Sequence, residues 1–206
     1  LNVHHVASDG ASTGVLLGEL DALYVAVHAG GAAAAAGLAP LAVQYVDYAA
    51  WQRGSLCGGV LDAQRGYWRS QLREGALPAL ELPTDYPRPA AQTFNGDAVA
   101  ASLGAGGTAR LRAVAATHGA TLYQVVLAVW AVLLCRHAGQ EEVVVGSPYH
   151  GRDAAGTEGL IGYFVNVLPL RVEAARGGSV GSLLRCAREA AVGGMAHAAL
   201  PLQQLV

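Results

Sequence analysis

The residues best suited to chemistry lie in one short segment, His4–Gly10, which reads HHVASDG. Histidine titrates near neutral pH, which suits its side chain to proton transfer. The Asp9 carboxylate is able to hold an imidazole in one tautomer or, alternatively, to pair with a buried cation and fix the turn. Gly10 allows a close backbone approach or a positive φ angle. These residue types at this spacing predict an acid–base site.

Two other interpretations of the histidine pair stay open at this point. Taken alone, a pair of adjacent histidines is more often structural or incidental than catalytic. A metal site is the weaker alternative, because no other cluster of cysteine and histidine supplies the remaining ligands. If residues 1–5 are extended, the His4 and His5 side chains point to opposite faces. We therefore expect one of them to pack inward and the other to face a cavity.

Composition argues against several classes of function. Of the 206 residues 53% are hydrophobic and 14% are charged, and the formal net charge of −2 gives no basic surface for a nucleic acid. The longest apolar run, Val125–Cys135, is too short to span a bilayer and predicts a buried core helix. Three scattered cysteines fit a reduced cytoplasmic protein better than a disulfide scaffold.

Helices and strands along the chain must position the segment. Residues 1–5 are predicted to end a strand, and a helix is predicted just after Gly10, which places Asp9 at a helix N-terminus. Strands separated by helices indicate an α/β, or mixed α+β, layered fold. Further helices are expected over residues 43–53, 62–73, 108–118, 122–138 and after Ser179, and further strands over residues 96–103, 142–146 and 163–172.

Local signals mark the ends of some of these elements. Thr121 is a suitable N-cap for the helix over residues 122–138, and Gly139 a suitable end. The stretch 75–89 holds too many prolines for regular structure and predicts an extended linker between two halves of the chain.

Several segments, in order along the chain, resemble the motifs of one family. The His4–Gly10 segment followed by Ser12 resembles the active-site motif of condensation domains of non-ribosomal peptide synthetases, which belong to the chloramphenicol acetyltransferase-like superfamily. The further matching segments are YVDYAAWQ at 45–52, LPTDYPR at 82–88, VGSP at 145–148 with Gly151-Arg152, and IGYFVNVLPLR at 161–171. The FVN form of the last segment is similar to condensation rather than epimerization domains, and the retained histidine pair is unlike heterocyclization domains.

The resemblance implies a partial two-lobed chloramphenicol acetyltransferase-like fold. Residues 1–89 would be the C-terminal part of the first lobe plus the inter-lobe linker, and residues 90–206 the larger part of the second. Members of the family are roughly double this length, so part of the domain is expected to lie outside the sequence. We expect the isolated chain to fold poorly or to expose apolar surface.

The resemblance also implies a reaction and its partners. The amine of an acceptor aminoacyl group attacks the thioester of a donor and forms a peptide bond. Donor and acceptor carrier proteins bring both groups on phosphopantetheine arms, with an adenylation domain as neighbour, and no cofactor binds the domain directly. The alternatives are an ester-forming acyltransferase that uses coenzyme A or a carrier protein, and a catalytically inactive module that docks carrier proteins.

The family's site residues transfer to this chain with unequal roles. His5 would lie nearest the chemistry, either as general base or by orienting the amine and stabilising the tetrahedral intermediate. His4, Asp9 and Gly10 would support it. Asp9 is implied to pair with an arginine that precedes the motif, outside this chain.

Three residues outside the segment are weaker candidates. Asn166 and Arg171 would contribute from the second lobe, although strand-end hydrogen bonding and surface charge explain them at least as well. Arg152 is able to bind a phosphate or a carrier protein, although a solvated loop arginine is the simpler interpretation. Departures from the family pattern stand at Ala11, at Val167 and in residues 197–203, which read HAALPLQ.

Overall fold

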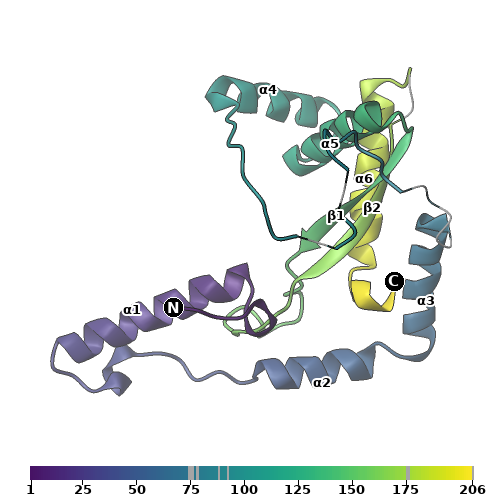
Figure 1. The fold of residues 1–206 in the computed structure, drawn as a ribbon. Coiled ribbons are helices and arrows are strands. Elements are labelled where there is room, and N and C mark those ends of the chain that lie inside the picture. The colour runs from purple at the N-terminus through teal and green to yellow at the C-terminus, as the bar shows by residue number, and fades with distance from the viewer. Residues whose placement is uncertain (74–76, 78, 88, 92, 175–176, 206) are drawn as a thin grey trace. The chain divides into compact units, whose positions relative to one another are not determined.

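The computed structural model describes residues 1–73, 77, 79–87, 89–91, 93–174 and 177–205 (Figure 1). Its helices are α1 (Gly10–His28), α2 (Tyr45–Ser55), α3 (Gly58–Gln71), α4 (Gly104–Thr117), α5 (Leu122–Ala138) and α6 (Val180–Ala196). Its strands are β1 (Glu142–Tyr149) and β2 (Asn166–Glu173), and short 3₁₀ turns are η1 (His5–Ala7), η2 (Ala33–Ala36) and η4 (Leu202–Gln204).

Most elements predicted from the sequence are confirmed, with shifted ends. The predicted strands over residues 1–5 and 96–103 are wrong. Residues 1–4 have no regular structure and lead into η1, and residues 96–103 are exposed and irregular. A weak alternation of side chains does not by itself provide a neighbouring strand to pair with.

The strands β1 and β2 are hydrogen-bonded neighbours. The Ala174 N–H donates to the Glu141 carbonyl oxygen at 2.7 Å, which brings the end of β2 beside the start of β1, so the two strands run antiparallel.

The chain divides into two compact units. The first unit comprises residues Leu1–Trp68, Pro148–Leu168 and His197–Val206, and the second comprises Arg69–Ser147 and Pro169–Ala196. The assignment of residues 1–89 and 90–206 to two lobes of the family fold stays a prediction. All of the His4–Gly10 segment lies in the first unit.

The second unit has its core between helices and strands. Helix α5 packs against both α4 and α6. Thr121 and Gln124 form a capping box at the start of α5, and Gly139 ends the helix with a φ of 69°, as the sequence predicts. The buried apolar side chains of these elements include Val125, Leu127, Ala128, Ala131, Cys135, Val143, Leu170, Val172, Leu184 and Ala187.

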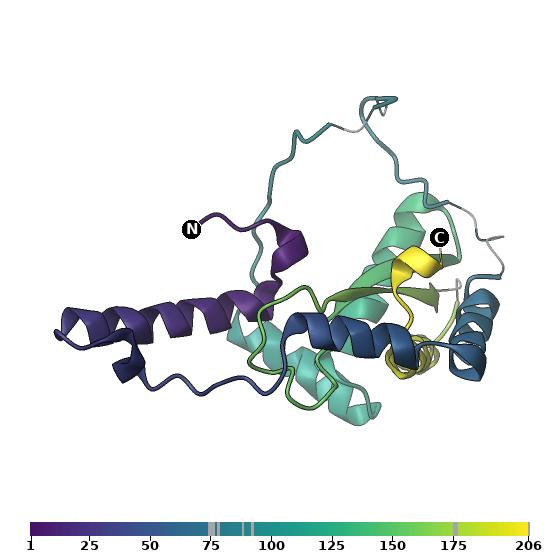
Figure 2. The ribbon, with the colours of Figure 1, turned by 90° about the horizontal axis from the view of Figure 1, so that it is seen from below.

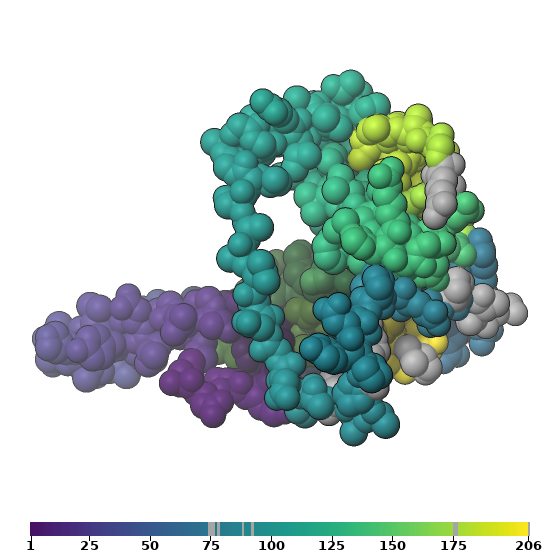
Figure 3. Space-filling model, turned by 45° about the horizontal axis from the view of Figure 1, so that its top comes forward, coloured from purple at the N-terminus to yellow at the C-terminus, as the bar shows by residue number. Residues whose placement is uncertain are grey.

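Helix α1 of the first unit is mostly exposed. The chain turns back after α1, and η2 lies against the helix (Figure 2). Figure 3 shows α1 with much of its surface uncovered. Its exposed apolar residues, consistent with the expected apolar surface, are Leu17, Leu20, Tyr24, Val25 and Val27. Helix α1 has the length and composition of a membrane span, a property that core helices of soluble proteins and signal sequences share.

Candidate active site

The two histidines begin a tight turn and use their ring nitrogens differently. His4 is the N-cap of η1, and its Nδ1 accepts the Val6 N–H at 3.0 Å. His5 Nδ1 lies 2.7 Å from the Ser8 carbonyl oxygen. Since a carbonyl oxygen only accepts, the bond assigns the proton of a neutral His5 ring to Nδ1 and leaves Nε2 as the basic nitrogen. His4 therefore stabilises the turn, while His5 keeps a nitrogen available for chemistry.

Asp9 caps α1 and is almost completely buried. Its side chain Oδ1 accepts hydrogen bonds from the Ser12 N–H and the Ser12 hydroxyl, both at 2.8 Å. Its Oδ2 accepts the Phe164 N–H at 3.1 Å. Arg152 Nη2 donates to Oδ1 at 3.0 Å, so the carboxylate also has a cationic partner. Asp9 thus joins the histidine segment to the loop between β1 and β2.

The Asp9–Arg152 ion pair corrects two expectations. The partner of Asp9 follows the histidine segment in this chain and does not precede it. Arg152 is no solvated loop residue, since its side chain is only 8% exposed and that of Asp9 1%. A separation of 143 residues gives no local signal of the pairing. The sequence signal that marks Arg152 is its place after Gly151 in a motif-like segment.

Arg152 is held by more than its ion pair. Its Nη1 donates to the carbonyl oxygens of Thr157 at 2.5 Å and Leu160 at 2.9 Å, and its Nη2 also donates to Ser12 Oγ at 2.8 Å. The guanidinium carbon lies 4.1 Å from the centre of the Phe164 ring, a cation–π contact. One arginine therefore ties the start of α1 to the loop around it.

Two glycines let this loop pack closely. Gly151 has a φ of 65°, and a Cβ there would lie 2.1 Å from the Phe164 carbonyl oxygen. A Cβ on Gly162 would lie 2.1 Å from Tyr45 Cδ2. No other residue type fits either position without moving the backbone or the Tyr45 ring. The close packing is what allows the Phe164 N–H to reach Asp9.

The aromatic residues of α2 pack on the same loop. Tyr45 donates its hydroxyl to the Tyr163 carbonyl oxygen at 2.7 Å, and its ring meets the Phe164 ring edge to face at 5.1 Å. The Tyr48 and Phe164 ring centres are 4.7 Å apart. Trp51, by contrast, is 57% exposed. Tyr45 and Tyr48 are therefore packing residues.

The surroundings of Asp9 change its acidity. Burial alone raises the pKa of the carboxyl. The hydrogen bonds from Ser12, Phe164 and Arg152 outweigh burial and lower this pKa from 3.8 to about 2. Because the group is buried, the shift corresponds to on the order of 2 kcal/mol in favour of the folded state when Asp9 is ionised.

The lowered pKa of Asp9 predicts a specific acid dependence of stability. A carboxyl whose pKa is lower in the folded than in the unfolded state stabilises fully above the unfolded value of 3.8 and stops stabilising as the pH falls through about 2. We expect the difference in unfolding free energy between wild type and Asp9→Asn to stay constant from neutral pH down to about pH 5 and to shrink below it. Urea unfolding at a series of pH values measures this difference, and a flat difference down to about pH 2 would contradict the prediction.

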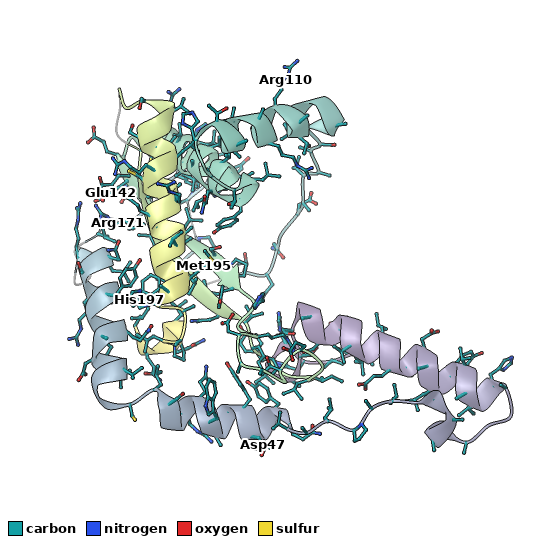
Figure 4. All side chains as sticks on the ribbon, turned by 180° about the vertical axis from the view of Figure 1, so that it is seen from behind. Asp47, Arg110, Glu142, Arg171, Met195 and His197 are labelled. Atoms are coloured by element: carbon teal, nitrogen blue, oxygen red, sulfur yellow. The ribbon has the colours of Figure 1, made fainter. Side chains whose placement is uncertain are left out.

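Asn166 and Arg171 make hydrogen bonds whose partners lie outside the His4–Gly10 segment. Asn166 Nδ2 donates to the carbonyl oxygens of Ala198 and Leu200 at 2.9 and 2.8 Å. Arg171, in the second unit, donates from Nε to Glu142 at 2.7 Å and also pairs with Glu173; Figure 4 labels Arg171 and Glu142. Any catalytic contribution of these two residues stays a prediction.

Two remaining sequence predictions concern metals and the linker. Within the ranges that the structure describes, no group of three or more histidine, cysteine, aspartate or glutamate residues is placed to hold a metal ion. The described part of the LPTDYPR segment is irregular, and Arg88 lies outside the described residues.

Comparison with known proteins gives concordant matches. The model of the condensation domain family matches residues 1–206. The chain is 45% identical to malpibaldin synthetase of Mortierella alpina and 44% identical to a linear gramicidin synthase of Brevibacillus parabrevis, each over 206 residues. These alignments cover 100% of this chain and 4% of each relative, so the chain spans a small part of their length.

Solved structures of the same fold agree. The X-domain from teicoplanin biosynthesis matches with a TM-score of 0.88 and 31% identity, over 98% of this chain and 45% of that one. The first condensation domain of the calcium-dependent antibiotic synthetase, in complex with a substrate analogue, matches with a TM-score of 0.74 and 27% identity, over 98% and 46%.

Proposed function

Because the chain belongs to the condensation domain family, we propose that it forms an amide bond within a non-ribosomal peptide synthetase. It has part of the chloramphenicol acetyltransferase-like fold of that family, and the family reaction is an acyl transfer that makes amide bonds. The substrates are a donor acyl or peptidyl thioester and an acceptor aminoacyl amine, each on the phosphopantetheine arm of a carrier protein. A neighbouring adenylation domain and a cytoplasmic location go with this proposal.

The observation that carries the proposal is the state of the His5 ring. With Nδ1 committed to the Ser8 carbonyl oxygen at 2.7 Å, the Nε2 atom is free to accept a hydrogen bond from the acceptor amine. A free α-amine has a pKa of about 7.7–8.0, so much of it is unprotonated near neutral pH. His5 therefore acts either as a base or by orienting the amine, and both roles use the same hydrogen bond.

The proposed step conserves atoms and charge. The amine nitrogen forms a bond to the thioester carbonyl carbon, the carbon–sulfur bond breaks, and the thiol of the donor arm leaves. The proton lost by the amine passes to the leaving sulfur, directly or through Nε2 of His5. The products are an amide on the acceptor arm and a free thiol on the donor arm, with no net change in protonation.

A condensation assay tests this function. We expect the synthetase that contains this chain to give an amide-linked product on the acceptor carrier when both carriers are loaded, as detected by intact-protein mass spectrometry. A hydroxy-acid acceptor and a coenzyme A donor are the controls for ester formation and for carrier independence. An ester product with the hydroxy-acid acceptor or the coenzyme A donor, and no amide product from the two loaded carriers, would support the ester-forming alternative.

The likeness to the X-domain favours a second candidate, a module that binds another protein. An X-domain from the same biosynthesis has been solved in complex with OxyB, and it too matches this chain with a TM-score of 0.88. A chain with this role would bind its carrier proteins equally well with and without His5 and would form no amide. The condensation assay separates the two candidates.

A further inference from the structure

The ring of His5 makes a second contact beside its hydrogen bond. The centres of the His5 and Tyr163 rings are 5.3 Å apart, and the ring planes meet at 80°. Such an edge-to-face arrangement is a favoured geometry for aromatic pairs. His5 is exposed and Tyr163 is half-buried, so the tyrosine ring is the more confined of the two.

A single hydrogen bond does not fix the direction of the Nε2 atom of His5. The ring is able to pivot about the bond from Nδ1 to the Ser8 carbonyl oxygen, because one contact point leaves the plane of the ring free. A second ring packed at nearly a right angle removes this freedom. Nε2 then points in one direction, which is the requirement for a hydrogen bond to the attacking amine.

Tyr163 is anchored by the residues that begin α1. The preceding Gly162 N–H donates to Ser12 Oγ at 3.0 Å, and the following Phe164 N–H donates to Asp9 at 3.1 Å. The backbone on both sides of Tyr163 is therefore bonded to the residues at the start of α1, four and seven positions after His5. The backbone beside Tyr163 is therefore fixed to the same short stretch of chain that carries His5.

We propose that Tyr163 is a positioning residue that orients the His5 imidazole, a role that rests on the proposed function of His5. Tyr163 acts through its ring and not through its hydroxyl. Loss of the ring lowers the fraction of His5 that points correctly and so lowers kcat, while substrate binding and KM stay unchanged. Loss of the hydroxyl alone leaves the orientation intact.

The test compares three variants of the full synthetase. Tyr163→Ala removes the ring contact and Tyr163→Phe keeps it. Tyr24→Ala is the matched control, because Tyr24 stacks on His28 at 5.7 Å elsewhere in the first unit. We expect Tyr163→Ala to lower kcat about three- to tenfold, the effect of one aromatic pair, and the other two variants to stay near wild type.

A second measurement does not depend on activity. Hydrogen exchange at the C2 carbon of each imidazole, followed by mass spectrometry at a fixed alkaline pH, reports the access of solvent to the ring. We expect Tyr163→Ala to speed exchange at His5 and not at His28, and Tyr24→Ala to do the reverse. Tyr163→Phe leaves both rates unchanged.

The outcomes separate this proposal from the proposed function. Wild-type kcat and wild-type His5 exchange in Tyr163→Ala overturn the positioning role, and so does a loss in Tyr163→Phe as large as in Tyr163→Ala. A wild-type enzyme that forms no amide overturns the proposed function instead, while the exchange rates at His5 still decide whether Tyr163 holds the ring. Backbone amide exchange at Ser12 checks that each variant is folded.

Discussion

Replacing His5 with alanine is expected to lower the rate of amide formation by about 10²- to 10⁴-fold, the range found for the loss of a positioned acid–base group. The imidazole supplies the one basic nitrogen that the turn leaves free, so no neighbouring group takes over. The exposed side chain contributes a single hydrogen bond to the turn, and its loss costs about 1 kcal/mol of stability. The fold should therefore survive. Single-turnover kinetics with both carriers loaded measures the effect on the chemical step.

Two other histidines provide controls for His5. His28→Ala, at the end of α1, should leave the rate unchanged, because His28 lies outside the histidine segment. His4→Ala should lower the rate less than His5→Ala, since His4 acts by accepting the Val6 N–H within the turn. Undiminished product from His5→Ala would exclude the catalytic role of His5.

Local signals explain which parts of the fold the sequence predicts well. Helix α5 has the predicted ends, Leu122–Ala138, because Thr121 caps its first turn and Gly139 takes a left-handed φ at its end. These signals act within a few residues and need no tertiary contact. The predicted strand over residues 96–103 is wrong for the opposite reason, since a strand needs a partner that its own sequence does not specify.

In the candidate site, too, some residues are predictable from local sequence and others depend on tertiary packing. The histidine segment and the capping position of Asp9 are evident from residues that are neighbours in sequence. The arginine that neutralises Asp9 is not, because the loop that carries Arg152 reaches Asp9 only through tertiary packing. Such packing depends on Gly151 and Gly162, where a Cβ would collide with Phe164 and Tyr45. The absence of a side chain at Gly151 and Gly162, which no charge pattern in the sequence reveals, therefore helps to bring Arg152 to Asp9.

Replacing Arg152 with methionine is expected to destabilise the first unit by about 3–5 kcal/mol, the cost of leaving one partner of a buried ion pair uncompensated. The variant loses the bonds to Thr157 and Leu160 as well as the bond to Asp9. Because Asp9 and Ser12 also anchor the segment around Tyr163, amide formation should fall together with stability. Urea unfolding measures the first effect and the condensation assay the second.

The double variant Asp9→Asn with Arg152→Met tests whether the ion pair itself is responsible. Asparagine still caps a helix, so the Asp9→Asn change chiefly removes charge. With both charges absent, the double variant should be more stable than the sum of the two single losses predicts, by about 1–3 kcal/mol. Arg185→Ala is the matched control, because the pair of Arg185 and Glu189 on α6 is 56% and 60% exposed and should contribute less than about 1 kcal/mol. An Arg152→Met variant as stable as Arg185→Ala would mean that the buried pair does not hold the site together.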